Sequence, residues 1–404
     1  MGTYVRQIWL SEGAGRTRRE RRSGAYHAYI PTPLAALPSD IPGDVAADLS
    51  CAAAALVRLN ATTGPLSDTE GIARLLLRAE AVSSSYIEGL SVTPRRLLRA
   101  EFGTRTGRED AHDAVASEIL GNIRAMERAI ALVDEEGGFS VDQLLDVHRT
   151  LTTGTRIERL GGVIRASQNW LGGNPYNPLD AEYVPPPPDQ VEPLLHDLVA
   201  YMNRDDLPPI VQAALVHGQF ETIHPFGDGN GRTGRALIHM VLRRRGVCPR
   251  IMPPLSLALA TSSQAYATAL AGLHVDDGDP DGVRRGLGEW LSYFADACLR
   301  ACDDTQAYEE HVATLEASWR ERLGSVRGGS ALDAMLPLLC ALPVFSVDTM
   351  AEATQRSVTA VSLATNQLAD AGIIEPTSAR LRGRVFEVPS IIEQFGELER
   401  ALRS

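Results

Sequence analysis

The most informative segment of the sequence is His224-Pro-Phe-Gly-Asp-Gly-Asn-Gly-Arg-Thr-Gly-Arg235. These twelve residues contain one histidine, one carboxylate, four glycines and two arginines. Glycines let main-chain amides approach an anion closely, and a helix that starts inside the run directs the positive end of its dipole at the same place. The run therefore predicts a phosphate-binding loop that continues directly into a helix.

The polar side chains of this loop supply the chemistry that a phosphate site needs. Histidine exchanges a proton near neutral pH, so His224 can take a proton from a hydroxyl group. Asp228 is a hard oxygen ligand of the kind that magnesium prefers. Arg232 and Arg235 can each form forked hydrogen bonds with phosphate oxygens.

The run resembles the signature of the Fic family, HPFx[DE]GNGRxxR, and matches it at every fixed position. The resemblance implies transfer of AMP from ATP to a protein hydroxyl, with His224 as general base and Asp228 holding Mg²⁺ across the α- and β-phosphates. It also implies nucleotide-binding roles for Gly229, Asn230, Gly231, Arg232 and Arg235, the last at the γ-phosphate.

A second segment resembles the inhibitory motif of the same family, [ST]xxxE[GN]. It is Ser84-Ser-Tyr-Ile-Glu88-Gly89, at the end of a helix predicted from Asp68 onward by its apolar stripe. Ser84 and Glu88 are one helical turn apart and would share a face. With Gly89 they form the predicted inhibitory site, in which Glu88 pairs with Arg235 and blocks the γ-phosphate position.

The segment before the loop has two interpretations. Residues 176–184 are followed by four prolines, Pro185 to Pro188, which is typical of a surface loop with an extended linker. The family resemblance instead implies a β-hairpin flap, in which Tyr183 and Val184 pair with the main chain of a target protein.

The chain is predicted to be mostly α-helical: a Fic helical core with a small β-hairpin flap and a C-terminal winged helix-turn-helix domain. The expected divisions are a disordered arginine-rich arm (1–23), an N-terminal extension with the inhibitory helix (24–105), a catalytic core (106–325) and a winged-helix-like domain (331–404). Predicted helices cover 45–59, 210–221, 231–245, 255–273 and 283–300, with a last one to 323. His148 is expected to be a hydrogen-bonded core or surface histidine and not a catalyst, and Tyr266 is expected to pack in the core.

In the tail, Ser357 caps a helix to about Ala369 that would be the recognition helix, and a hairpin surrounds Arg380, Arg382 and Arg384. From Ala331 to Ser404, however, six arginines face nine acids, a net charge of −3. DNA binding by this domain is therefore disfavoured against a packing or dimerising role, because non-specific phosphate affinity needs positive charge.

Composition limits the class of protein further. Apolar residues make up 44% of the 404, without a run long enough for a membrane helix or a signal peptide, so we expect a cytoplasmic protein that does not bind membranes. The net charge of −12 argues against a protein that coats nucleic acid. All 39 basic residues are arginine, which excludes a lysine-containing P-loop. The five cysteines are expected to be buried thiols.

The expected function is that of a protein adenylyltransferase that uses ATP and Mg²⁺ on an unidentified protein target, the chain itself included, and that is restrained by Glu88. Two alternatives stay open. The same loop could transfer another phosphate-containing group, although the kinase branch of the family replaces the glycine at Gly231 with a bulkier residue. The chain could also be a DNA-binding regulator that senses nucleotide. A homodimer is open as well.

Overall fold

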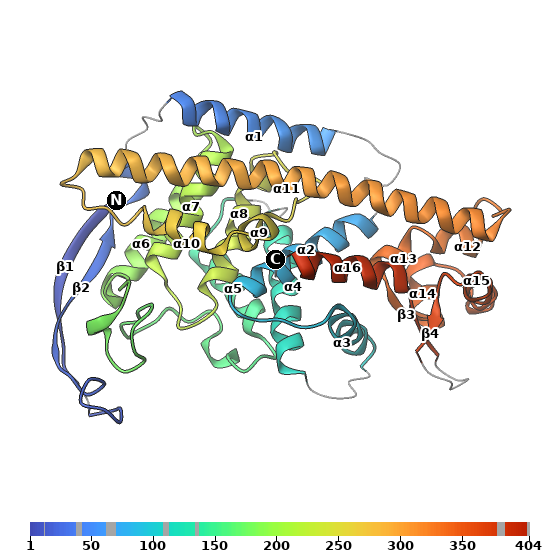
Figure 1. Cartoon of the computed structure of the whole chain (residues 1–404), viewed down its shortest axis with the longest axis horizontal. Helices are drawn as coiled ribbons and strands as arrows, with labels where there is room; N and C mark the ends of the chain where they lie inside the picture. Colours follow the sequence, from blue (N-terminus) through green and yellow to red (C-terminus); the bar gives the residue numbers. More distant parts are fainter. Residues whose placement is uncertain are drawn as a thin grey trace. The chain divides into compact units, whose positions relative to one another are not determined.

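The computed structural model describes residues 1–11, 13–37, 43–61, 70–107, 113–133, 137–377 and 384–401, and most of them are helical (Figure 1). The chain divides into two compact units. The first comprises Met1–Ala54, Arg124–Val247 and Ser262–Ala297, and the second comprises Ala55–Ile123, Cys248–Thr261 and Cys298–Ser404. Each unit thus combines three segments that are separated in the sequence, whereas the predicted domains are consecutive stretches of the chain.

The first unit opens with a two-stranded antiparallel ribbon, β1 (Gly2–Trp9) and β2 (Gly24–Pro31), in register from Gly2↔Pro31 to Trp9↔Gly24. The predicted disordered arm is therefore wrong for β1. Val, Ile, Tyr and Trp favour strands, and the ladder to β2 satisfies the main-chain groups of these residues. Tyr29 anchors the ribbon, because its hydroxyl donates to the carbonyls of Leu273 and Val275 at 3.2 and 3.0 Å.

The helices around the glycine-rich run confirm the predicted pattern. The run starts directly after α7 (Pro209–Ile223), and its second half forms the start of α8 (Asn230–Arg244), which packs on α7. The other helices that lie entirely in this unit are α5 (Val141–Thr152), α6 (Pro188–Met202) and α10 (Ser263–Ala271). Within the predicted four-proline linker, Pro188 is the first residue of α6, a position that needs no amide donor.

Three further helices contribute residues to both units: α1 (Gly43–Ala61), α4 (Ala114–Val133) and α11 (Pro280–Leu323). The prediction of separate helices over 283–300 and up to 323 is wrong, because α11 is continuous. Its sequence between those limits lacks a proline and carries a glycine only near its start, so nothing in it forces a break.

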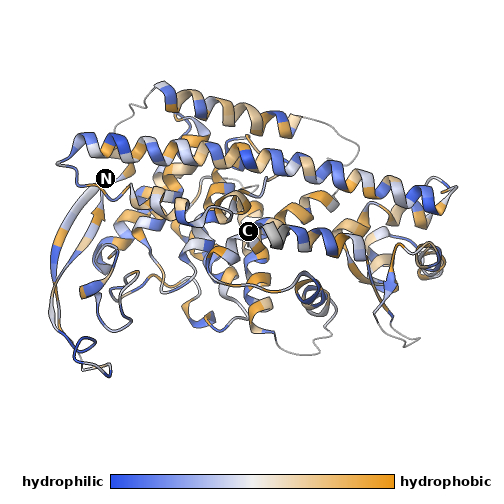
Figure 2. Ribbon diagram, viewed as in Figure 1, coloured by the Kyte–Doolittle hydropathy of each residue, from blue (hydrophilic) through white to orange (hydrophobic). Residues whose placement is uncertain are grey.

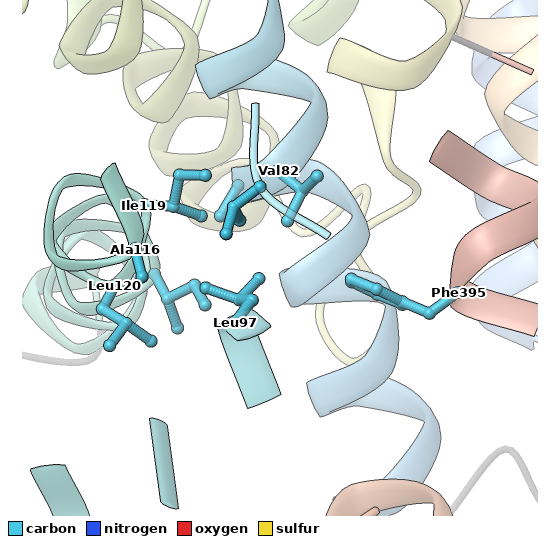
Figure 3. Packing of buried hydrophobic residues seen from close by; sticks show 9 residues of the cluster. Val82, Leu97, Ala116, Ile119, Leu120 and Phe395 are labelled. Atoms are coloured by element: carbon cyan, nitrogen blue, oxygen red, sulfur yellow. The ribbon is translucent and has the colours of Figure 1, made fainter. Parts of the chain in front are cut away.

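The second unit contains α2 (Glu70–Ile87), α3 (Pro94–Thr106) and α9 (Leu255–Ala260). One of its apolar clusters joins α2, α3 and the start of α4, with Phe395 of α16 (Pro389–Ala401) packed against it (Figure 3). Val82, Leu97 and Ile119 are among its buried members. This packing fixes the helix that carries the predicted inhibitory motif.

The tail of the second unit has the elements α12 (Ala331–Met335), α13 (Leu338–Ala341), β3 (Val344–Ser346), α14 (Val347–Thr354), α15 (Val358–Asp370), β4 (Glu375–Pro376) and β5 (Val385–Glu387). The strands form an antiparallel sheet in the order β3-β5-β4. Glu387 forms ion pairs with Arg95 and Arg99 of α3 at 3.1 and 2.6 Å. The winged helix stays a prediction, and its Arg380 and Arg382 lie outside the described residues.

None of the helices in the described ranges is long and apolar enough to cross a membrane. Hydrophilic and hydrophobic residues alternate along the helices, α11 included (Figure 2). Four of the cysteines are buried as predicted, whereas Cys51 on α1 is exposed. Burial raises the pKa of the Cys340 thiol to about 12, and it raises the pKa of Cys302 to a similar value, so both stay protonated.

Candidate active site

The glycine-rich loop begins with a helix end that is closed by His224 itself. The main chain of His224 adopts the left-handed conformation, with φ 50° and ψ 60°, and its N–H donates to the carbonyl of Phe220 at 2.9 Å. Nδ1 of the side chain lies 3.3 Å from the carbonyl oxygen of Glu221. Because a carbonyl can only accept, this contact requires the proton on Nδ1, which makes Nε2 the basic nitrogen.

Asn230 closes the loop instead of extending its side chain toward a ligand. Its Oδ1 accepts from the N–H of Phe226 at 2.8 Å, and its Nδ2 donates to the carbonyl of Phe226 at 2.9 Å. The side chain of Asn230, which was predicted to help bind phosphate, is therefore hydrogen-bonded to the main chain of the loop itself. The main-chain amides of Asn230, Gly231 and Arg232 lie in the first turn of α8, where helix N–H groups lack intrahelical acceptors.

Gly229 is the N-cap of α8 and has a φ of 82°, a conformation that favours glycine. A Cβ atom there would lie 3.0 Å from Leu151 Cδ2 and 3.2 Å from His148 Nε2. The loop therefore has room for no side chain at this position. Leu151 and His148 belong to α5, so the loop packs against this helix. The sequence of the run does not indicate this contact.

Asp228 projects from the loop with 42% of its side chain exposed. Its Oδ1 accepts from the N–H of Gly229 at 2.6 Å and lies 3.5 Å from Nη2 of the buried Arg232. Among the described residues, no three His, Cys, Asp or Glu side chains gather to hold a metal. A single exposed carboxylate still fits magnesium, which usually takes one or two protein carboxylates plus waters and substrate phosphates.

His148 on α5 is a positioning residue for this loop, which the sequence does not indicate. It is fully buried, and its ring stacks on Phe226 with centroids 3.6 Å apart. Nδ1 accepts from the N–H of Gly162 at 3.0 Å, so Nε2 carries the proton and donates to the carbonyl of Asp228 at 2.9 Å. Burial, the largest cause, lowers its pKa to about 4, which keeps this tautomer neutral.

Arg165 and Asn169 hold the other end of the loop. The Nε of Arg165 donates to the carbonyl of His224 at 2.9 Å, and its main-chain N–H donates to the carbonyl of Pro225 at 2.9 Å. Nδ2 of Asn169 lies 3.2 Å from the carbonyl of Phe226. Arg165 is buried, and burial lowers its pKa to about 10, so the guanidinium stays charged at neutral pH.

Arg235 is almost fully buried on the second turn of α8. The preceding Gly234 allows α8 to approach α7 closely, since a Cβ there would lie 2.9 Å from Phe220 Cδ1. Nε2 of His217 on α7 and the hydroxyl of Tyr266 on α10 form a 2.7 Å hydrogen bond, and Tyr266 is buried, as predicted for a core residue. Burial, followed by the charge of Arg235, lowers the pKa of His217 to about 3.

The predicted flap is not a hairpin of two strands. Over residues 161–187, all of which are described, one antiparallel bridge joins Leu171 and Tyr183 and a second joins Asn174 and Asn177. Tyr183 faces inward, because its hydroxyl donates to the carbonyl of Thr222 at 2.7 Å and its ring stacks on His274. Val184 is buried, and its carbonyl accepts from the N–H of Tyr29.

The predicted inhibitory residues lie at the end of α2, in the second unit, whereas the loop lies in the first. Ser84 is fully buried, and Glu88 is exposed in the turn that follows the helix. Gly89 has a φ of 78° and its N–H donates to the carbonyl of Tyr86 at 2.9 Å. The glycine of the motif is therefore a helix stop, which explains its place after the glutamate.

Comparison with known proteins identifies the class to which this loop belongs. The model of the Fic/DOC family matches residues 138–242, and the model of the Fic/DOC family N-terminal region matches residues 46–131. These two segments of the chain are therefore Fic/DOC family segments.

Among curated proteins, the chain is 31% identical to "Protein adenylyltransferase fic-1" of Caenorhabditis elegans over 165 residues, which are 39% of this chain and 28% of that protein. It is 32% identical to "Protein adenylyltransferase Fic" of Drosophila melanogaster over 174 residues, 41% of this chain and 32% of that one. The match thus spans about three tenths of the length of these relatives.

The fold is shared with a Fic family protein from Desulfovibrio desulfuricans, with a TM-score of 0.54 and 18% identity over 87% of this chain and 98% of that one. The solved segment of Fic-1 from Caenorhabditis elegans gives a TM-score of 0.50 and 20% identity over 66% and 73%.

Proposed function

We propose that this protein transfers AMP from ATP to a hydroxyl group of a protein. The observation that carries the proposal is the loop itself: a histidine whose basic nitrogen is Nε2, an exposed carboxylate and the first turn of α8 lie within one short segment. The names of the curated relatives support the same activity.

The reaction requires no covalent enzyme intermediate. The target oxygen attacks the α-phosphorus, its new bond to phosphorus forms as the bond from phosphorus to the bridging oxygen breaks, and pyrophosphate leaves. Nε2 of His224 takes the hydroxyl proton. The amides at the start of α8 and the guanidinium of Arg232 would stabilise the charge on the phosphate oxygens.

Asp228 would hold magnesium, which when bound would neutralise negative charge on the phosphates of ATP. The hydrogen bond from His148 to the carbonyl of Asp228 supports this role, because it orients the main chain that carries the carboxylate. Arg235 is assigned to the γ-phosphate, and the flap around Tyr183 and Val184 to the target. Since the N–H and the carbonyl of Tyr183 and the carbonyl of Val184 already have partners, the target would contact neighbouring parts of the flap.

We propose further that Glu88 inhibits the enzyme by pairing with Arg235, with Ser84 and Gly89 shaping the end of α2. The tail is assigned a packing role, because its β5 residue Glu387 pairs with α3. Its helix α15 carries no basic residue and exposes Val358 and Leu363, which favours packing or a homodimer over DNA.

The test uses ATP labelled either on the α- or on the γ-phosphate, incubated with the protein and a cell lysate. Transfer of the α-label to protein, without the γ-label, supports AMP transfer. His224→Ala should reduce this transfer by at least roughly 10²-fold while ATP still binds, because other groups hold the phosphates. Transfer of the γ-label, or full activity of His224→Ala, would overturn the proposal.

A further inference from the structure

The N-terminal ribbon ends in a strongly basic tip. The connection between β1 and β2 carries five exposed arginines, namely Arg16, Arg18, Arg19, Arg21 and Arg22. Two acids, Glu12 and Glu20, occur among the first 23 residues, in a chain whose net charge is −12. A local cluster of positive charge on a chain that is negative as a whole attracts negatively charged partners.

The tip is bound to the flap. Nδ2 of Asn177 donates to the carbonyls of Arg19 and Glu20 at 3.1 and 2.9 Å. Nε of Arg19 lies 2.9 Å from Oδ2 of Asp180. Trp9, the last residue of β1, packs edge-on against Trp170 with ring centroids 5.3 Å apart. These contacts keep the arginines beside the flap.

The same stretch of chain reaches the proposed general base. Asn169, which precedes Trp170, approaches the carbonyls of His224 and Phe226 with its Nδ2, at 3.4 and 3.2 Å. Side chains of one short segment thus contact the active loop on one side and the ribbon on the other. A target chain held at the flap would pass the arginine-rich tip.

One face of the ribbon adds apolar surface to this charge. Side chains at every second position of a strand share a face, so Tyr4, Arg6 and Ile8 of β1 lie on one side, and Leu10 follows directly after the strand. Ile8 and Leu10 are 66% and 75% exposed. His27 and Ala25 lie opposite Arg6 and Ile8 in the ladder and are exposed as well. The ribbon therefore offers a surface that is both basic and aliphatic.

We infer that the ribbon docks the protein target through an acidic, aliphatic segment next to the hydroxyl that is modified. This inference rests on the proposed function and names the chemistry of its substrate. Acidic residues match the arginines, and aliphatic ones match Ile8 and Leu10. The attachment of the tip to the flap, where a protein target is proposed to bind, favours a protein over a nucleic acid or a membrane.

The experiment measures the binding of fluorescein-labelled peptides to the full chain by anisotropy. One peptide carries glutamates and leucines around a single threonine, and its counterpart has glutamine in place of each glutamate. We expect the acidic peptide to bind about 10-fold more tightly, since four exposed ion pairs each contribute a small term. Replacing Arg16, Arg18, Arg21 and Arg22 with serine should abolish the difference, and replacing the same four with lysine should retain most of it.

Equal binding of the two peptides, or an unchanged preference in the serine variant, would overturn the inference. So would tighter binding of single-stranded RNA or of anionic vesicles through the same arginines. Equal melting temperatures of the variants exclude misfolding as the cause. Transfer of α-labelled AMP, measured in parallel on lysate protein, tests the proposed function separately, because peptide binding does not depend on catalysis.

Discussion

His148 and His224 have opposite tasks at the active loop, which His148 contacts from α5. His224 presents a basic nitrogen, whereas both ring nitrogens of His148 are engaged with main-chain groups of Gly162 and Asp228. Sequence gives no sign of the second role, because its partners are main-chain atoms 14 and 80 positions away. What could be predicted at this scale was the set of side chains inside the run, since their roles follow from local chemistry.

His148→Leu should lower kcat for AMP transfer by roughly 10- to 100-fold, because the carbonyl of Asp228 loses its donor and the loop shifts. His148→Gln should restore much of the activity, since an amide can accept from Gly162 and donate to Asp228. Steady-state kinetics at several magnesium concentrations measure both variants. A leucine variant with wild-type kcat and magnesium dependence would show that the contact does not position the loop.

Asp228→Ala should reduce the rate and weaken the magnesium requirement together, because magnesium sites of this kind contain very few protein carboxylates. The measurement is the transfer rate as a function of magnesium concentration. Asp228→Asn serves as the matched control, since it keeps the size of the side chain and an acceptor oxygen but removes the charge. If both variants keep the wild-type magnesium curve, the metal ligand lies elsewhere.

At the scale of elements, α2 ends where its sequence motif ends. Gly89 takes the left-handed conformation, and the N–H groups of Glu88 and Gly89 bond back to Ser85 and Tyr86. The residue proposed to inhibit the enzyme is thereby exposed in a turn of defined geometry. In the same unit the buried Glu80 of α2 accepts two hydrogen bonds from Ser256, which secures the helix.

Glu88→Gly should raise AMP transfer, because the carboxylate no longer competes with the γ-phosphate for Arg235. Self-modification of the variant should appear where the wild type shows little, measured with α-labelled ATP. Glu88→Gln should also activate, which would show that charge, and not helix propensity, matters. Arg235→Ala added to Glu88→Gly should silence transfer again. A Glu88→Gly variant no more active than the wild type would return Glu88 to the role of an ordinary exposed charge.

The helices on either side of the loop could be predicted because apolar periodicity and the glycine-rich run define their ends. The N-terminal ribbon could not. Arginine dominates the composition of residues 10–23 and indicates a solvated arm, and the pairing of β1 with β2 joins residues up to 29 positions apart. The hairpin flap was expected from the family resemblance alone, whereas hydrogen bonds of the Asn174 and Tyr183 side chains shape this segment.

For the molecule as a whole, buried histidines connect stability to pH. Burial is the largest cause that lowers the pKa of His148 to about 4, and of His217 and His274 to about 3. In the unfolded chain each would titrate near 6.5. Between these values the unfolded state binds more protons than the folded state, so acidification favours unfolding.

Above pH 6.5, protonation of these histidines should therefore not affect the free energy of unfolding. As the pH drops from 6.5 toward 4, the free energy of unfolding should fall. The slope should approach about 1.4 kcal/mol per pH unit for each histidine. Urea denaturation at a series of pH values measures it. His148→Gln should have a shallower slope than the wild type over this range, and an identical slope would contradict the assignment.

The exposure of Cys51, with the other four thiols buried, makes the natural sequence suitable for site-specific labelling. A maleimide dye or spin label should attach to α1 without any cysteine being replaced. Because the sequence contains no lysine, the label cannot react with lysine amines. The mass of the intact labelled protein would therefore identify the product. The labelled protein would then serve for distance measurements and single-molecule fluorescence on the unaltered chain.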